Sequence, residues 1–405
     1  MIADNVLIRN RNFRKLVITD MFTKFADSMD NVIITLLVIK LTGSSTSTGI
    51  LLAITTLPGI LFSLIGGTLS DMKSQKKILT MMTVLQAGLL LVLAFLVKVD
   101  KISFLLLCIL LFVLESLSRF YSPALTSAVV NVVSKEDYNQ AIATRSTVES
   151  VVQMVGSSLC ATFVTFIGYA ATLLVNSFSY LSSSILASKL EIKSNMNAKK
   201  TSVKDVLSNA KLGLNYVMSN GTILGLILVI SLINFILAWF DVSLPFLLTD
   251  SLHIPVESLG YIKAVSTFMF IIAGIVMSLY KVKRIKQTIL VSIAVFGGAV
   301  LGLSYVKGVY TLALIWGGAA FVRTIVSLLL MAELTYFSDK NMIGRVMGFF
   351  MLITSVSMFL SRLLSGKLVS YFGASTTFKI AGFMLIMIAI ISFKMVPKRK
   401  IEVGE

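Results

Sequence analysis

The sequence predicts an all-α membrane protein in which twelve transmembrane helices form two six-helix bundles. Three observations support this prediction. Apolar residues make up 56% of the 405 residues and charged residues only 14%, a balance with which a soluble domain cannot cover its surface with polar groups. The apolar residues stand in long unbroken runs, which favour helices over the alternating strands of a membrane barrel. Twelve crossings of about 20 residues also leave about 13 residues for each connection or tail.

The apolar runs, read between turn and charge signals, place the helices in chain order. The first six are expected at 14–41, 47–70, 77–97, 103–130, 140–167 and 170–188. The second six are expected at 221–248, 258–280, 288–306, 309–335, 342–372 and 376–396. The longest polar connection separates the two sets. We therefore expect an N-terminal bundle at 1–190, a cytoplasmic linker at 191–220 and a C-terminal bundle at 221–405.

The linker carries apolar residues at helical spacing, namely Val203, Leu207, Ala210, Leu214 and Val217. Polar and charged residues lie between them, so the segment is predicted to be an amphipathic helix at the membrane surface. A helix that binds a partner protein is the alternative interpretation.

The formal charge of +17 is distributed unevenly over the predicted connections. With a cytoplasmic N-terminus, 24 of the 36 lysines and arginines fall on inner segments and five on outer ones. This bias predicts a multi-pass protein of the cell membrane with both termini in the cytoplasm. The partner that this charge indicates is the lipid bilayer and not nucleic acid.

The residues that several kinds of catalysis and metal binding need are missing from the predicted interior. His253 is the only histidine and lies in a predicted outer connection, while Cys108 and Cys160 sit inside apolar runs as packing residues. No metal site, histidine-based catalytic triad or nucleotide-binding loop is therefore predicted. We expect no enzyme activity, no cofactor and no direct use of ATP, and we expect a monomer.

The two halves of the sequence resemble each other. A shift of 211 positions superimposes Asp30 on Asp241 and Gly49 on Gly260, together with the loops and basic clusters around them. A shift of 205 carries Phe166-Ile167-Gly168 onto Tyr371-Phe372-Gly373. The pattern is typical of parallel repeats related by an axis along the membrane normal, in which the binding site lies between the halves near mid-membrane.

The segment from Gly67 to Lys77 resembles the loop between helices 2 and 3 of the major facilitator superfamily, glycine-x-x-x-aspartate-arginine-x-glycine-arginine-arginine. Gly67, Asp71, Lys76 and Lys77 fit this pattern, whereas methionine and serine replace its first arginine and its second glycine. The resemblance implies a twelve-helix transporter that works by alternating access. It also implies a cytoplasmic gate in which Asp71 meets the start of helix 11 near Arg345. An exposed loop carboxylate among lysines is the alternative.

Four further segments resemble the macrolide and siderophore exporters of that superfamily. They are Ala26-Asp27, Leu41-Thr42-Gly43-Ser44, Phe120-Tyr121-Ser122-Pro123-Ala124 and Gly344-Arg345-Val346-Met347-Gly348. Gly156-Ser157-Ser158 stands where the antiporters of the superfamily have a glycine-proline motif, here without the proline.

The first predicted helix carries an unusual polar stripe. Asp20, Lys24, Asp27 and Asn31 follow spacings of four, three and four, which place them on one face. Because a charge in the bilayer costs several kcal/mol, this face is expected to avoid lipid. Asp20 and Lys24 can neutralise each other, which leaves Asp27 as the candidate carboxylate for a proton or a cationic substrate. The alternative is a polar seam packed against another helix.

Other charges in the predicted spans are candidates for the same site. Asp30 and Asp241 are repeat mates that we expect to face one cavity, although Asp241 precedes Pro245 and can instead stabilise a distorted helix end. Glu115 with Arg119, and Arg145 with Glu149, are one turn apart and form either proton relays or permanent struts. The arginine of the first pair resembles the family's helix-4 arginine.

Arg323 has no carboxylate one turn away, so its partner is expected from another helix or from the substrate. Acidic and basic residues in the spans are nearly balanced, and the sequence therefore does not assign a charge to the substrate.

These observations predict a secondary transporter that exports an amphipathic, drug-like small molecule by proton antiport. Asp27 is expected to take up a proton outside and release it inside, with Glu115 and Arg119 modulating it. The alternatives are an exporter of a siderophore or peptide natural product and a non-transporting membrane receptor or scaffold.

Overall fold

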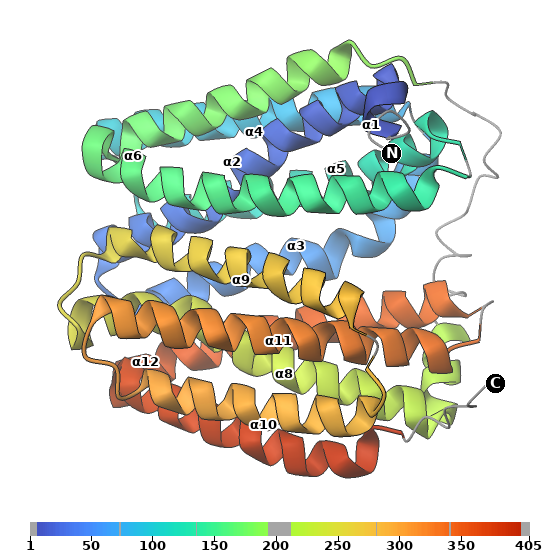
Figure 1. The fold of residues 1–405 in the computed structure, drawn as a ribbon. Coiled ribbons are helices and arrows are strands. Elements are labelled where there is room, and N and C mark those ends of the chain that lie inside the picture. Colours follow the sequence, from blue (N-terminus) through green and yellow to red (C-terminus); the bar gives the residue numbers. More distant parts are fainter. Residues whose placement is uncertain are drawn as a thin grey trace. The chain divides into compact units, whose positions relative to one another are not determined.

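The computed structural model describes residues 6–72, 74–134, 136–192, 212–280, 282–339 and 342–397, without the side chains of residues 63–72 and 139. Within these ranges the regular structure is entirely helical, as Figure 1 shows. The elements before the linker are α1 (Val6–Arg9), α2 (Arg11–Thr42), α3 (Ser45–Met72), α4 (Gln75–Lys98), α5 (Phe104–Val132) and α6 (Tyr138–Ser188). The elements after it are α8 (Gly221–Phe246), η1 (Leu247–Ser251), η2 (Val256–Ser258), α9 (Leu259–Leu279), α10 (Ile285–Leu303), α11 (Val309–Phe337) and α12 (Ile343–Met395).

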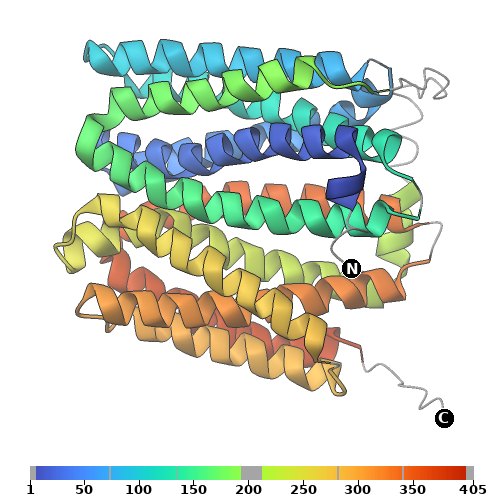
Figure 2. The ribbon, with the colours of Figure 1, turned by 45° about the horizontal axis from the view of Figure 1, so that its top comes forward.

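Nine of the described helices are long and apolar enough to cross a membrane. The two longest, α6 and α12, each hold two crossings, because the chain bends at Gly168 and at Gly373. The bend of α6 is visible in Figure 1 and again in Figure 2. Helix α2 is outside the nine because charged residues interrupt it. With α2 and the divided helices the described chain has twelve crossings, which confirms the predicted fold class.

The two bends are equivalent positions of the sequence repeat. Gly168 has φ 79° and ψ 174°, and Gly373 has φ 78° and ψ 163°. Residues with a Cβ atom almost never adopt this backbone conformation, so both positions require glycine. The repeat found in the sequence is thus present as repeated backbone geometry.

The chain divides into two compact units. Unit 1 comprises 1–44, 54–206 and 257–264, and unit 2 comprises 45–53, 207–256 and 265–405. The predicted boundaries at 190 and 220 stay a prediction. Most of the predicted amphipathic helix lies outside the described residues, whereas residues 212–219 are helical.

Each unit contains one close approach at a repeated glycine. In unit 2, a Cβ atom on Gly49 would lie 2.5 Å from the carbonyl oxygen of Arg362. In unit 1, a Cβ atom on Gly260 would lie 2.5 Å from the carbonyl oxygen of Ser157. These distances leave no room for a side chain, so the beginnings of α3 and α9 pack on their neighbours in equivalent ways.

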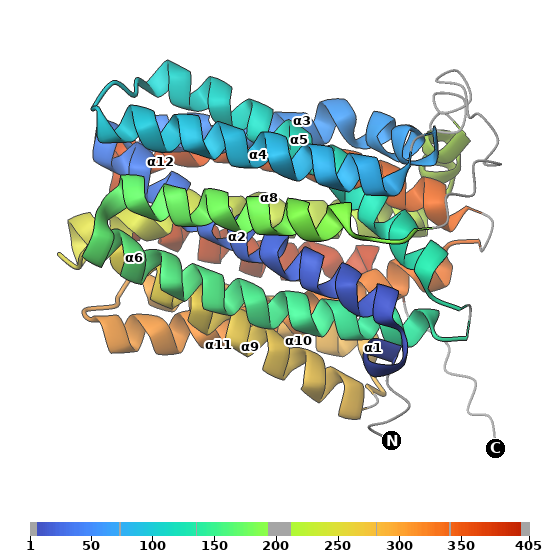
Figure 3. The ribbon, with the colours of Figure 1, turned by 90° about the horizontal axis from the view of Figure 1, so that it is seen from above.

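Unit 1 is organised around α2, which runs beside α6 (Figure 3). One end of this unit has an apolar core that includes Phe13, Leu16, Leu125 and Val129. Towards the middle of α2 the buried side chains become polar, beginning with Thr19 and Asp20. The charged stripe predicted on this helix is therefore turned into the unit and lies within reach of α5 and α6.

We predict that Gly373→Ala lowers the free energy of unfolding by about 1 to 3 kcal/mol, because an L-residue is strained at φ 78° and ψ 163°. Gly298→Ala, inside α10, is the matched control. A Cβ atom at either glycine would meet no atom within 4 Å, so the two variants differ in backbone conformation and not in crowding. The control is expected to be neutral or slightly stabilising. Denaturant unfolding in detergent micelles measures both, and equal stabilities would contradict the prediction.

Candidate functional site

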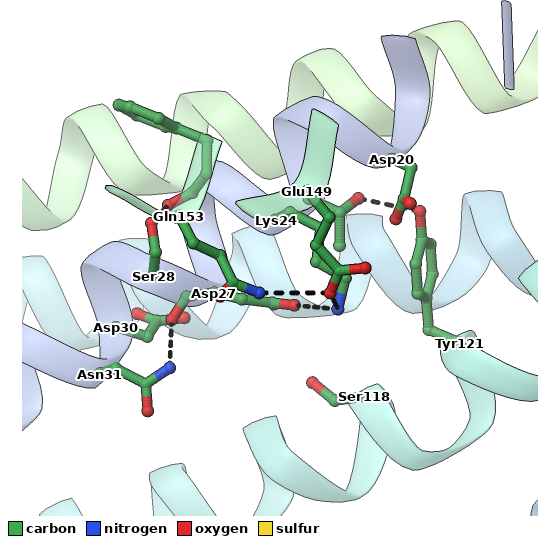
Figure 4. A network of polar contacts seen from close by, with 12 residues as sticks. Asp20, Lys24, Asp27, Ser28, Asp30, Asn31, Ser118, Tyr121, Glu149 and Gln153 are labelled. Atoms are coloured by element: carbon green, nitrogen blue, oxygen red, sulfur yellow. Dashed lines mark hydrogen bonds and ion pairs between the residues drawn. The ribbon is translucent and has the colours of Figure 1, made fainter. Parts of the chain in front are cut away.

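The candidate site is a network of charged and polar side chains in unit 1, drawn in Figure 4. Helix α2 contributes Asp20, Lys24, Asp27 and Asp30, while Glu149 and Gln153 come from the first arm of α6. The second arm of α6 adds the polar residues described below.

Asp20 is paired with an arginine from another helix. Arg145 Nε donates a hydrogen bond of 2.7 Å to Asp20 Oδ2, and the Asp20 side chain is only 4% exposed. We expected Asp20 to be neutralised by Lys24, and Arg145 to pair with Glu149 one turn along its own helix. Both expected ion pairs were wrong, because contact between α2 and α6 places Asp20 and Arg145 beside each other.

Lys24 is shared between two carboxylates. Its Nζ lies 3.1 Å from Asp27 Oδ2 and 3.5 Å from Glu149 Oε1 (Figure 4). Gln153 Nε2 donates to Glu149 Oε1 at 3.2 Å. One ammonium group therefore holds one acid on α2 and one on α6. Any change in the charge of either acid alters the contact between these helices.

Tyr180 bridges two carboxyl groups. Its hydroxyl oxygen lies 2.8 Å from Asp27 Oδ1 and 2.9 Å from Asp30 Oδ2. Asn176 Nδ2 also donates to Asp30 Oδ1 at 2.7 Å. A tyrosine hydroxyl carries one proton and can donate to only one of the two acids. The second contact becomes a hydrogen bond when the other carboxyl group is itself protonated and donates to the tyrosine oxygen.

Asp30 is buried, with 5% of its surface exposed. In the described part of the chain no lysine or arginine lies within ion-pair distance of its carboxylate, in contrast to Asp20 and Asp27. A carboxyl group buried with only neutral partners favours the protonated form. Asp27 and Asp30 are thus joined through one tyrosine hydroxyl, and only Asp27 has a cation beside it among the described residues.

Asn31 continues the stripe at its exposed end. Its side chain donates to the Asp27 carbonyl oxygen at 2.8 Å, and its own carbonyl oxygen accepts from Lys263 Nζ at 3.0 Å. Asn31 therefore stabilises local backbone groups and does not contact a carboxylate.

Glu115 and Arg119 on α5 form the predicted one-turn pair, with 3.9 Å between their closest charged atoms. A Cβ atom on Gly59 of α3 would lie 3.2 Å from the Arg119 guanidinium carbon, so this glycine makes room for the arginine. Both charged side chains are partly exposed, and the choice between relay and strut stays open.

Asp241 in unit 2 differs from its repeat mate Asp30. Its side chain is 40% exposed and lies 3.0 Å from Arg362 Nη2, while Arg362 Nη1 donates to the Leu52 carbonyl oxygen at 2.9 Å. The helix after Pro245 does become irregular, with the π-helical turn η1. Asp241 is thus one half of an ion pair, and equivalent sequence positions carry different chemistry in the two units.

Arg323 on α11 lines a cavity of about 180 Å³ in unit 2. No hydrogen bond or ion pair joins its guanidinium group to any residue that the structure describes. The predicted partner from another helix is therefore absent from the described residues.

The predicted gating residues are described only in part. The surroundings of Gly67 and the side chain of Asp71 are not described, and Lys76 and Lys77 are in the first turn of α4. Arg345 Nη1 lies 3.0 Å from Met342 Sδ. The latch between Asp71 and Arg345 stays a prediction.

Sequence reasoning missed Tyr180, Asn176 and the role of Arg145. A signal for the first two was present, since they lie one turn apart on one face of an arm of α6 that carries no charged residue. Their contact with Asp30 depends on how two helices pack, which the periodicity of either helix does not determine. Within the described ranges, no group of three or more histidine, cysteine or acidic residues is arranged to hold a metal ion.

The fold and its charged interior define a class, the secondary transporters of the major facilitator superfamily, which are not enzymes. The model of the transmembrane secretion effector family, MFS_3, matches residues 6–403, so the chain belongs to that family. The uncharacterized MFS-type transporter YkuC of Bacillus subtilis (strain 168) is 26% identical over 187 residues. That match covers 46% of this chain and 43% of the relative, so it spans less than half of either protein.

Solved structures show the same fold at low sequence identity. A mutant of the nucleoside transporter NupG superposes with a TM-score of 0.78 at 12% identity, covering 96% of this chain and all of the other. An auto-inhibited peptide transporter of the POT family gives 0.75 at 11%, over 98% and 99% of the two chains. A bacterial homolog of the lysosomal transporter Spinster gives 0.74 at 12%, over 95% and 97%.

We predict that Arg145→Gln lowers the free energy of unfolding by about 3 kcal/mol, because it leaves Asp20 buried without its cation. The double variant Asp20→Asn/Arg145→Gln should regain more than half of this loss, since it removes both charges. Arg9→Gln is the control. Arg9 pairs with Asp137 but is 59% exposed, so its loss should cost less than about 1 kcal/mol. Denaturant unfolding in detergent provides the measurement, and equal losses for Arg9 and Arg145 would refute buried pairing.

Proposed function

We propose that this chain exports an amphipathic, drug-like small molecule by alternating access in exchange for protons. The observation that carries the coupling is the Tyr180 hydroxyl, which lies between the carboxyl groups of Asp27 and Asp30. The resemblance to macrolide and siderophore exporters, together with membership of a secretion effector family, supports the direction of export.

The proton site is proposed to work through the shared lysine. While Asp27 is ionised, Lys24 is divided between Asp27 and Glu149. A proton on Asp27 removes one of these two attractions, and Lys24 is then held by Glu149 on α6 alone. The balance of forces between α2 and α6 changes with the protonation state, which is what a coupled transporter needs in order to favour one conformation over another.

Proton entry also supplies sufficient driving force. A single charge that moves with the membrane potential releases about 2.3 kcal/mol per 100 mV, before any pH gradient is counted. A factor of ten in concentration costs about 1.4 kcal/mol, so one proton can drive more than a tenfold accumulation of an uncharged molecule.

We further propose that both termini are cytoplasmic. The support is the sequence bias, which places most lysines and arginines on one set of connections. With this orientation the protons enter from the outside.

An exporter of a siderophore or peptide natural product is the second candidate, supported by the same branch resemblance. A receptor or scaffold that does not transport would need no exchangeable proton. Flux measurements therefore separate it from both transporters.

We predict that Asp30→Asn and Tyr180→Phe each reduce proton-coupled flux at least tenfold, because either change removes the shared proton between Asp27 and Asp30. Reconstituted proteoliposomes with a pH-sensitive dye inside report proton movement when amphipathic compounds are added one at a time. Ser182→Ala is the matched control, since Ser182 lies on the same arm of α6 but is partly exposed and bonded only to its own helix. Substrate counterflow that ignores the pH gradient in the unmodified protein would exclude proton antiport.

For the orientation, we predict that alkaline phosphatase fused to either terminus is inactive in cells, because that enzyme matures only outside the cytoplasm. The same enzyme inserted at Asp100, between α4 and α5, should be active. The opposite pattern would reverse the proposed topology and, with it, the direction of proton entry.

A further inference from the structure

Most of the described charges in the spanning helices are paired within their own unit. Asp20 is paired with Arg145, Asp27 and Glu149 share Lys24, Glu115 is paired with Arg119, and Asp241 is paired with Arg362. Arg323 differs from all of these cations, since it has no such partner in the part of the chain that the structure describes. An unmatched guanidinium group near the middle of a membrane helix is costly, which makes it a functional-site candidate.

The surroundings of Arg323 form a small amphipathic cavity. Its volume is about 180 Å³, and helices α8, α9 and α11 contribute its walls. Apolar side chains predominate, among them Ile233, Leu237, Phe270 and Leu330. Arg323 therefore presents a positive charge to a pocket whose lining is mostly apolar.

The unused donors of the cavity belong to Arg323 and Ser327. Ser327 lies one turn after Arg323 on α11 and forms no hydrogen bond with the described residues. The Thr324 hydroxyl already donates to the Ala320 carbonyl oxygen, and the Asn234 amide nitrogen donates to the Ile230 carbonyl oxygen. The guanidinium N–H groups and the Ser327 hydroxyl thus remain available to a ligand. Such a set recognises an acceptor and, with the positive charge, an anion.

Asp241 does not remove this charge. It attracts Arg323 electrostatically but lies beyond ion-pair distance, and its carboxylate is held by Arg362 at 3.0 Å. The counter-charge for Arg323 is therefore expected from outside the protein.

We infer that this cavity binds the anionic end of the transported molecule, and that the substrate class is a carboxylate attached to an apolar body. The carboxylate accepts two hydrogen bonds from the Arg323 guanidinium group, and the apolar body lies along Phe270 and Leu237. Sites that hold a whole drug-sized ligand measure about 300 to 1,000 Å³, so this cavity accommodates one end of the substrate. The inference rests on the proposed transport of a small molecule and assigns its charge.

The test uses three probes of similar size, namely 4-phenylbutyrate, its primary amide and 4-phenylbutylamine. Calorimetry with the purified full-length protein in detergent measures binding without any gradient. The carboxylate should bind at least roughly tenfold more tightly than the amide or the amine, as a charge-assisted hydrogen-bond pair requires. Arg323→Gln should abolish this preference, and Arg323→Lys should retain part of it. Lys307→Gln removes the same charge from an exposed loop and should leave the preference unchanged.

Equal binding of the three probes, no binding of the carboxylate, or a preference that survives Arg323→Gln overturns the inference. Thermal unfolding of each variant without probe is measured in parallel, and Arg323→Lys provides a folded comparison if the glutamine variant is unstable. Proton antiport is tested separately, and flux in proteoliposomes that does not depend on the pH gradient would reject it. A carboxylate preference with gradient-independent flux would uphold the binding site and reject proton coupling.

Discussion

The constraint on which this structure depends is the cost of a charge inside an apolar environment. Moving an ionised side chain into the membrane costs several kcal/mol unless a partner compensates, so each charge in a spanning helix has to be matched or used. In unit 1 the matching is done by contact between α2 and α6, which places Arg145 on Asp20 and Lys24 between Asp27 and Glu149. This ionic contact makes α2, the most polar of the long helices before the linker, compatible with a membrane position.

The two units satisfy the same constraint in different ways. Unit 1 contains several acids and holds two of them on one tyrosine hydroxyl. Both of these contacts are hydrogen bonds only when one of the two carboxyl groups is protonated. Unit 2 pairs its equivalent acid, Asp241, with an arginine and leaves another arginine facing a cavity. We propose that one repeat binds the coupling proton and the other the substrate, a division that a duplicated backbone with diverged polar residues permits. The repeated bends at Gly168 and Gly373 show that the two units kept the same backbone geometry at these positions.

Predictions from the sequence pattern were correct where they concerned a property of one continuous stretch of the chain. Length and hydropathy predicted the crossings, and a turn at each glycine was visible as a break between two apolar runs. The stripe on α2 was recognised from spacing, because residues three and four apart must share a helical face. The same reasoning failed for ion pairs. One-turn spacing suggested Asp20 with Lys24 and Arg145 with Glu149, but a partner on a neighbouring helix at 2.7 Å is stronger than one reached along the helix surface.

The sequence by itself determined that this chain is an all-helical membrane protein with two related halves and ionisable residues in its spans. Hydropathy, charge bias and repeats are properties of residue order, and the bilayer imposes helices on any such chain. Only the tertiary structure decided which charges neutralise one another, that Tyr180 and Asn176 contact Asp30, and that Arg323 faces a cavity without an ion-pair partner among the described residues. These contacts join residues far apart in the chain. They depend on the rotation and depth of packed helices, which residue spacing within one helix does not determine.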